Sequence, residues 1–368
     1  MERDRAVAEP IAAADDYAVF SGESACGALC RSSDRERGLK RRRTAKGFEY
    51  VNARGRVITD ARRLAHIAAL AIPPAWTDVW ICANPDGHLQ ATGRDARGRK
   101  QYRYHPLWRA QRENEKFARI ADFARALPRV RAAVERDLAL PGLPRQKVIA
   151  AIVRLLDRTL ARIGGVEYAR DNATYGLTTL RKRHVRQRSH SLVLCFKGKH
   201  GVPHELEVED ECVREVVCAC ERLPGAHLFV CREDDALHRI AAEDVNHYLQ
   251  QAGGCTITAK DFRVWGASVA ALALLREREP PATKRAAQTG IAAVTREVAG
   301  LLRNTPAVCR RSYVHPCVTE AWRTGALATL RQPRGSLALG RTERAFAALL
   351  ASSPNTWQRQ ALAAAGVS

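Results

Sequence analysis

The hydrophobic pattern of this 368-residue chain changes its period near residue 105. Before that point, short apolar segments stand between turn signals, as at Asp78–Cys82 and Leu89–Thr92 on either side of the turn Asn84–Gly87. After it, apolar residues recur at helical spacing, as in Lys147–Arg162. The pattern predicts a small antiparallel, β-rich domain followed by a larger, mainly α-helical domain, an α+β class.

These patterns divide the chain into four expected segments. We expect a disordered or mobile tail over residues 1–38, a β-rich domain over 39–108, a mainly α domain over 109–330, and a tail with short helices over 331–368. One hairpin, Ser191–Phe196 with Pro203–Val208, interrupts the helices and has a glycine-bounded tip. The basic run Lys40–Arg43 is either a solvated charge run or a strip that contacts phosphates.

The charge balance favours a polyanionic partner. The chain has 60 Lys and Arg against 39 Asp and Glu, a formal net charge of +21, and nucleic acid is the leading candidate. A basic protein from an arginine-rich proteome is the alternative. No apolar stretch approaches the length of a membrane span and no apolar signal core begins the chain, so we expect a cytoplasmic protein and no membrane partner. The eleven scattered cysteines favour buried free thiols over disulfides or a zinc site.

Three basic residues are candidates for binding or protonating a phosphate ester. Arg263 stands in an apolar helical stretch, where an arginine is costly unless it is paired or binds an anion. Arg162 precedes two glycines and could equally face the dipole of the helix that it ends. Lys199 lies at the hairpin tip, where it either faces solvent or donates a proton in a groove.

Tyr313 and Asn304 complete this candidate set. A lone tyrosine on a helix is usually a core residue, but Tyr313 stands between Arg310-Arg311 and a turn, nine residues after Asn304. Nearby guanidinium groups would favour its phenolate form. Asn304 can donate a hydrogen bond to a phosphate oxygen, or cap the helix that follows it. No Gly-rich nucleotide loop and no paired acidic motif is present, so we expect no ATP, cofactor or metal.

A second candidate surface lies in the β-rich domain. Gln101, Tyr102 and Tyr104 form a strand that follows the basic residues Arg99 and Lys100. Basic and aromatic side chains interleaved in this way suit contacts with DNA backbone and base edges, although a half-buried edge strand would have the same pattern.

Six segments, taken in order, resemble the motifs of the bacterial and poxviral type IB DNA topoisomerases. They are Ile72–Val79, Gly98–Tyr104, Arg162–Leu180, Phe196–Lys199, Lys260–Arg263 and Asn304–Tyr313. The resemblance covers roughly residues 40–325 and implies a C-shaped clamp around double-stranded DNA. It also implies that Tyr313 is the nucleophile, Arg162 and Arg263 bind the phosphate, and Lys199 is the general acid. Tyr168 would contact DNA, and Asn304 departs from the histidine of poxviral members.

The implied activity is relaxation of supercoiled DNA of both signs through a 3′-phosphotyrosyl intermediate, without ATP or metal, by an isomerase associated with the bacterial nucleoid. We expect a monomer, because the sequence has no heptad repeat and no long exposed apolar stripe. A tyrosine recombinase is the closest alternative, but it would typically have histidine where Lys260 stands and a helical N-terminal domain. A non-catalytic basic DNA-binding protein is the other alternative, and it would form no covalent adduct.

Overall fold

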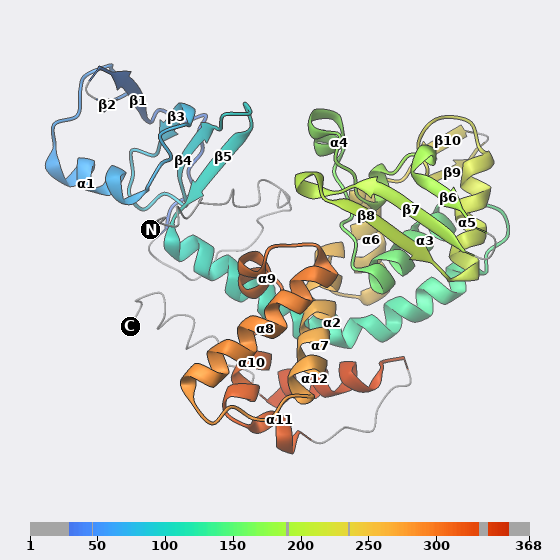
Figure 1. Ribbon diagram of the computed structural model, residues 1–368. Helices are drawn as coiled ribbons and strands as arrows, with labels where there is room; N and C mark the ends of the chain where they lie inside the picture. Colours follow the sequence, from blue (N-terminus) through green and yellow to red (C-terminus); the bar gives the residue numbers. More distant parts are fainter. Residues whose placement is uncertain (1–28, 46, 189–190, 235, 331–337, 353–368) are drawn as a thin grey trace. The chain divides into compact units, whose positions relative to one another are not determined.

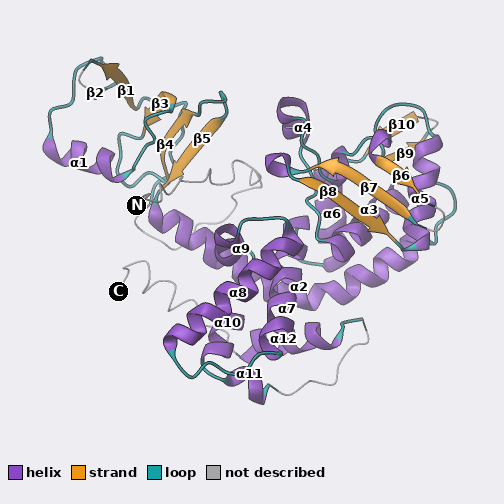
Figure 2. Ribbon diagram, in the orientation of Figure 1, coloured by secondary structure: helices purple, strands orange, loops and turns teal. Residues whose placement is uncertain are grey.

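The computed structural model describes residues 29–45, 47–188, 191–234, 236–330 and 338–352. The chain divides into two compact units, of which the first ends at Glu113 and the second begins at Asn114. This division falls inside helix α2 (Pro106–Leu138), whereas the sequence pattern placed it at residue 108. A β-sheet in the first unit and a mainly helical second unit confirm the α+β class (Figure 2). The clamp arrangement stays a prediction.

The first unit is a five-stranded antiparallel sheet with the order β2-β1-β3-β4-β5 (Figure 1). Its strands are β1 (Leu39–Thr44), β2 (Gly47–Val51), β3 (Thr77–Ile81), β4 (Leu89–Arg94) and β5 (Lys100–Tyr104). Helix α1 (Ala61–Ala69) begins at Asp60, whose side chain accepts the Arg63 N–H at 2.7 Å. Ile67 of α1 is buried in one cluster with Ile81 and Ala91, so α1 covers one face of the sheet.

The basic run Lys40–Arg43 forms strand β1 inside the sheet, and its side chains Lys40, Arg42 and Arg43 are exposed. Both interpretations of this run, as solvated charges or as a strip that contacts phosphates, stay predictions. Within it, Arg41 donates to the carbonyl of Pro73 at 3.0 Å and to that of Trp76 at 2.6 Å. Residues 29–38, expected in the N-terminal tail, pack on the sheet, where Ser32 Oγ donates to the Leu89 carbonyl at 3.0 Å. The rest of that tail lies outside the described residues.

The second unit combines helices with a small sheet. After α2, its helices are α3 (Arg145–Thr159), α4 (Val166–Asn172), α5 (Glu211–Arg222), α6 (Ala242–Gly253), α7 (Ala259–Arg276), α8 (Lys284–Leu302), α9 (Pro306–Ser312), α10 (Pro316–Arg323), α11 (Ala326–Thr329) and α12 (Arg341–Ser352), with 3₁₀ turns η1 (Leu177–Thr179), η2 (Lys182–His184) and η3 (Lys199–Gly201). The sheet has the order β6-β7-β8, with β6 (Val185–Gln187), β7 (Leu192–Lys197) and β8 (Pro203–Val208), and a separate hairpin pairs β9 (Val230–Glu233) with β10 (Ala236–Arg239). No helix in these ranges is long and apolar enough to cross a bilayer.

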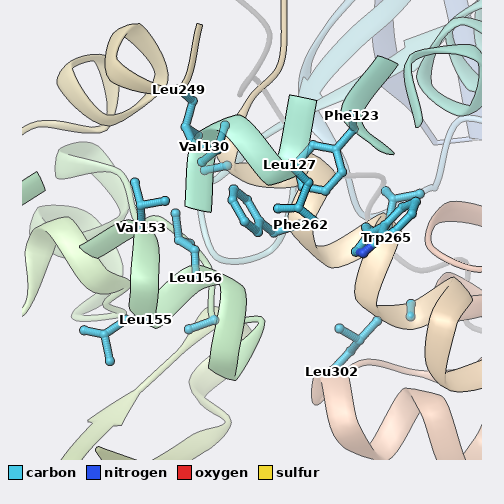
Figure 3. Close-up of a cluster of buried hydrophobic side chains, with 14 of the residues drawn as sticks. Phe123, Leu127, Val130, Val153, Leu155, Leu156, Leu249, Phe262, Trp265 and Leu302 are labelled. Carbon is cyan, nitrogen blue, oxygen red and sulfur yellow. The ribbon is translucent and has the colours of Figure 1, made fainter. Parts of the chain in front are cut away.

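Helix α7 lies at the centre of the second unit because it is apolar on nearly every side. Its Phe262 packs edge to face on Phe123 of α2, with ring centroids 4.9 Å apart, and Leu156 of α3 lies in the same cluster (Figure 3). Burying each such side chain stabilises the fold by about 2 kcal/mol. This packing holds α7 rigidly between its neighbours.

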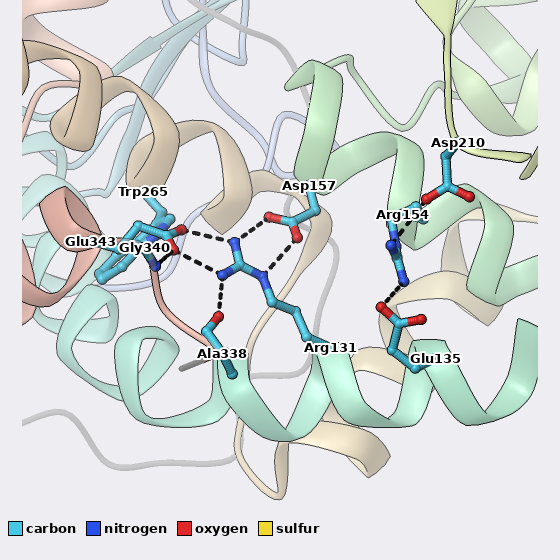
Figure 4. Close-up of polar contacts among 9 residues, drawn as sticks. All are labelled: Arg131, Glu135, Arg154, Asp157, Asp210, Trp265, Ala338, Gly340 and Glu343. Carbon is cyan, nitrogen blue, oxygen red and sulfur yellow. Dashed lines mark hydrogen bonds and ion pairs between the residues drawn. The ribbon is translucent and has the colours of Figure 1, made fainter. Parts of the chain in front are cut away.

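An ion-pair cluster ties helix α12 to this centre (Figure 4). The Arg131 guanidinium of α2 binds Asp157 of α3 at 2.8 Å and Glu343 of α12 at 2.8 Å, and Trp265 Nε1 of α7 donates to Glu343 at 2.9 Å. Phe346 of α12 is fully buried. A short helix was predicted in the segment after residue 330 and is present as α12, but it packs against the core through Phe346 and Glu343 and is not a separate tail. Residues 353–368 of the predicted tail lie outside the described residues.

Candidate active site

Tyr313 stands at the carboxyl end of the short helix α9. Thr305 caps this helix with its side chain and Pro306 begins it, so the alternative that Asn304 is the helix cap was wrong by one residue. The Tyr313 N–H donates to the Cys309 carbonyl at 2.9 Å. Its own carbonyl accepts the Ser268 hydroxyl of α7 at 3.2 Å. The tyrosine is thus fixed against the central helix, with its side chain partly buried.

Arg263 of α7 is buried beside Tyr313, at 3% exposure, with its guanidinium carbon 5.0 Å from the centroid of the phenol ring. It donates to the carbonyl of Leu160 and, at 3.0 Å, to that of Leu302. These carbonyls end helices α3 and α8, where the helix dipoles place partial negative charge. Within the described ranges no carboxylate pairs with Arg263 and its Nε has no hydrogen-bond partner. Its positive charge therefore remains available to an anion.

Arg162 and Asn304 meet from the ends of the same two helices. The predicted helix over Lys147–Arg162 ends earlier, at Thr159, because Leu160 adopts a left-handed conformation with φ 53°. Arg162 then donates through Nη2 to Asn304 Oδ1. A guanidinium only donates, so this contact turns the Asn304 amide nitrogen away from it. That Nδ2 is buried and has no partner among the described residues, so it can donate to an oxygen of a ligand.

The glycines of the first arginine motif are required by close backbone packing. Gly164 has φ 99°, and a Cβ on Gly176 would lie 2.5 Å from the Gly164 Cα. This contact lets the Arg162 carbonyl accept the Leu177 N–H at 3.0 Å. Tyr175 in turn donates its N–H to the Lys197 carbonyl at 2.7 Å. The segment 164–177 therefore joins Arg162 to the end of strand β7.

Lys199 lies at the tip of the hairpin formed by β7 and β8, as predicted. The tip is closed by the Gly198 N–H, which donates to the Val202 carbonyl at 2.8 Å. The Lys199 ammonium lies 6.0 Å from the centroid of the Tyr168 ring on α4, a cation–π contact. Two residues predicted to act on DNA, Lys199 and Tyr168, are thus neighbours.

The electrostatics of the site favour an ionised phenol. Burial alone would raise the pKa of Tyr313, but Arg263, Arg162 and Lys260 together hold that pKa below its ordinary value of 10.0. Burial also lowers the pKa of His204 on β8 to about 4, with further lowering by Arg303, Arg162 and Arg263. His204 is therefore neutral at neutral pH, and the arginines act on both Tyr313 and the hairpin.

Three residues outside the predicted set also contact the segments that form the site. They are Ser268, His204 and Arg303, and the sequence pattern singled out none of them. His204 is 5% exposed and stacks on Phe196 across the hairpin, with ring centroids 4.9 Å apart. Its inward position follows from the alternation along β8, which could have identified it. Ser268 and Arg303 carry no signal that separates them from ordinary helix residues.

The residues predicted to contact DNA in the first unit differ in how they are placed. Arg99 and Lys100 form ion pairs with Asp95 at 2.7 Å and Asp34 at 2.5 Å. Gln101 is buried, at 8% exposure, and its amide donates to the same Asp95 at 2.9 Å. The Gln101 amide is thus bound to a carboxylate inside the unit.

Tyr102 and Tyr104 share the other face of β5. Their rings stack with centroids 6.1 Å apart, and both are partly buried. The Lys100 ammonium lies 5.5 Å from the Tyr102 ring. β5 is an edge strand of this sheet, so one side of its backbone pairs with no other strand among the described residues. Tyr102, Tyr104 and Lys100 therefore form a basic and aromatic strip along an edge of the sheet.

The arrangement in the second unit suits a tetrahedral anion. It offers two guanidinium groups and a neutral amide donor beside a tyrosine of lowered pKa. In the described part of the chain, no three His, Cys, Asp or Glu side chains gather closely enough to hold a metal ion. Phosphate oxygens match these donors, because guanidinium groups bind them as planar forks.

Comparisons with known proteins identify the family. Residues 105–324 match the family "Eukaryotic DNA topoisomerase I, catalytic core", and residues 47–95 match "Bacterial DNA topoisomerase IB, N-terminal domain". The DNA topoisomerase 1B of Acanthamoeba polyphaga mimivirus is 32% identical over 285 residues, which cover 75% of this chain and 85% of the viral protein. The DNA topoisomerase 1B of Vaccinia virus (strain Copenhagen) is 25% identical over 240 residues, 62% of this chain and 70% of that protein. The chain therefore belongs to the type IB DNA topoisomerases.

Proposed function

We propose that the chain relaxes supercoiled DNA by transient cleavage of one strand, with Tyr313 as the nucleophile. The Tyr313 oxygen forms a bond to phosphorus while the bond from phosphorus to the 5′ oxygen breaks. The phenol proton is lost to solvent as the phenolate forms. The product is a 3′-phosphotyrosyl link and a free 5′ hydroxyl, and religation is the same reaction in reverse.

Arg263 and Arg162 bind the non-bridging oxygens and stabilise the charge that grows on them in the transition state. Asn304 adds a neutral hydrogen bond through its Nδ2. Lys199 gives its proton to the departing 5′ oxygen. The observation that carries the proposal is the buried Arg263 guanidinium over the Tyr313 ring at 5.0 Å, without a carboxylate partner in the described ranges.

The covalent link conserves the phosphodiester bond energy, so the reaction needs no ATP, and the arginines replace a metal in neutralising the phosphate. While Tyr313 holds the 3′ end, the free 5′ end rotates, and torsion of either sign is released. The strip of Lys100, Tyr102 and Tyr104, together with Tyr168, would contact the duplex. A monomeric state and a cytoplasmic location, predicted from the sequence, are part of this proposal.

The test is relaxation of negatively and positively supercoiled plasmid in EDTA without ATP. We expect wild type and the control Tyr50→Phe to relax both plasmids, and Tyr313→Phe to bind DNA without relaxing it. Denaturant-trapped covalent adducts should form with wild type and be absent from Tyr313→Phe. A wild-type protein that binds plasmid but leaves it supercoiled would instead support a site-dependent recombinase or a non-catalytic binder.

A further inference from the structure

Arg303 occupies an unusual backbone position next to Asn304. It ends helix α8 in the left-handed conformation, with φ 51° and ψ 53°. Glycine is the residue most often found at such a helix end, because a side chain there is crowded by the backbone. This turn directs the Asn304 N–H to the Ala299 carbonyl at 2.9 Å. From this strained backbone conformation we infer that the Arg303 side chain has a structural or functional role.

The Arg303 side chain reaches the hairpin that carries Lys199. Its Nη2 donates to the Glu205 carbonyl of β8 at 3.1 Å. β8 is the edge strand of the sheet β6-β7-β8, and it pairs only with β7 among the described strands. A carbonyl on its open side has no strand partner and is free to accept from a side chain. Arg303 therefore links the end of α8 to the outer strand of the hairpin.

The hairpin is closely packed from Glu205, to which Arg303 donates, up to its tip. His204, next to Glu205, stacks on Phe196 and lies directly beneath Gly198, where an added Cβ would be 2.5 Å from its Nε2. This packing leaves little freedom between Glu205 and the residue before Lys199. Arg303 also contributes to the lowered pKa of His204, after burial, which agrees with its place beside this strand.

We propose that Arg303 is a positioning residue that holds strand β8 so that Lys199 reaches the departing 5′ oxygen. The inference rests on the proposed function, in which Lys199 is the general acid. In this proposal Arg303 promotes protonation of the leaving 5′ oxygen. It does not contribute to binding of the phosphate oxygens, which Arg162, Arg263 and Asn304 contact.

The test compares two duplexes that differ in one atom at the scissile bond. In the first the leaving atom is the ordinary 5′ oxygen, and in the second it is sulfur. Because thiols are much stronger acids than alcohols, a 5′ thiolate departs without a proton donor. Loss of the acid should therefore slow cleavage of the oxygen duplex and spare the sulfur duplex. Loss of a phosphate contact should slow both.

The variant is Arg303→Gly, which keeps the left-handed turn and removes the side chain. Single-turnover formation of the covalent adduct is measured at saturating enzyme for both duplexes. We expect Arg303→Gly to be slowed about 10-fold or more on oxygen and less than about 2-fold on sulfur, below the effect of about 100-fold or more expected for Lys199→Ala on oxygen. Arg303→Lys, which can still donate to the Glu205 carbonyl, should recover part of the rate on oxygen.

The controls separate the possible failures. Arg296→Ala removes an exposed arginine of the same helix and should leave both rates unchanged. Asn304→Ala should slow both duplexes. If Arg303→Gly slows both duplexes equally, or neither, the positioning role is wrong while the proposed function stands. If Lys199→Ala is not rescued by sulfur, the acid assignment in the proposed function fails and this inference fails with it.

Discussion

The Leu160 side chain lies directly against the backbone of Gly266. A Cβ on Gly266 would be 2.5 Å from Leu160 Cδ2, so helix α7 has no room for even a methyl group there. Leu160 ends α3 in a left-handed conformation, and its carbonyl accepts a hydrogen bond from Arg263. The contact therefore sets both the spacing of α3 and α7 and the position of a proposed catalytic guanidinium.

We expect Gly266→Ala to destabilise the protein although alanine favours helix. Overpacking at this contact should lower the free energy of unfolding by about 1–3 kcal/mol. The adduct-forming rate should fall as well, because Leu160 must move and its carbonyl helps to hold Arg263. The measurements are denaturant unfolding and single-turnover cleavage.

Gly300 in α8 is the matched control for this substitution. A Cβ there would meet nothing within 4 Å. Gly300→Ala should therefore raise the free energy of unfolding by up to about 1 kcal/mol through helix propensity alone. Equal effects of the two substitutions would mean that the Leu160–Gly266 contact does not constrain the helices.

Glu343 should contribute strongly to the free energy of unfolding. Glu343→Gln keeps the shape but removes the charge that faces Arg131 and weakens the acceptor for Trp265 Nε1. We expect a loss of about 2 kcal/mol in the free energy of unfolding. Glu297→Gln is the control, because its ion pair with Arg278 is exposed and should contribute less than about 1 kcal/mol.

The same carboxylate should make stability depend on acid pH. Burial alone would raise the pKa of Glu343, but hydrogen bonds from Arg131 and Trp265 hold it below its ordinary value of 4.5. A lowered folded pKa means that the stabilisation is complete above the ordinary pKa and is lost as the pH falls through the folded pKa. The difference in unfolding free energy between wild type and Glu343→Gln should therefore shrink below about pH 4.5. A difference that stays constant down to pH 3 would contradict this account.

The pH profile of cleavage should report the phenol of Tyr313. Its pKa is lowered by Arg263, so the reactive phenolate forms at lower pH than for a free tyrosine, and the cleavage rate should rise with pH through that pKa. Arg263→Ala should slow cleavage by about 100-fold to 1,000-fold and move the rising limb to higher pH. A slower rate with an unmoved limb would assign Arg263 to the phosphate alone.

The parts of the fold that were predicted correctly have a regular hydrophobic period. The hairpin around Lys199 appears where expected, because the alternation along its strands is a local signal. Strand β1 was missed because only Leu39 of its residues is buried, so its charged sequence gives no period. What makes β1 a strand is its pairing with β2 and β3, which are distant in the chain or beyond a turn.

The residues of the candidate site likewise divide into those with a local sequence signal and those whose role depends on long-range contacts. Arg263 could be singled out from the sequence because an arginine inside an apolar helix needs an anion or a partner. The roles of Arg303 and Gly266 depend on contacts with Glu205 and Leu160, each about 100 residues away in sequence. No local pattern encodes such contacts, so these residues could be found only in the folded chain.

Asn304 gives the sharpest test of how the phosphate is bound. Its Oδ1 accepts from Arg162 and its Nδ2 has no partner in the described part of the chain. Asn304→Asp keeps the acceptor for Arg162 but replaces the donor by a second acceptor with negative charge. We expect Asn304→Asp to cleave more slowly than Asn304→Ala, which should itself lose about 10-fold, because the aspartate repels the phosphate as well as losing the hydrogen bond.

Asn304→His should retain most of the cleavage rate, because a neutral imidazole can also donate one hydrogen bond to an oxygen. All three variants are compared by single-turnover adduct formation at fixed salt, with DNA affinity measured in parallel so that binding and chemistry are separated. If Asn304→Asp and Asn304→Ala cleave equally fast, the Nδ2 donor does not contact the phosphate. Asn304 would then act only through Arg162, and two guanidinium groups would have to stabilise the transition state without a neutral donor.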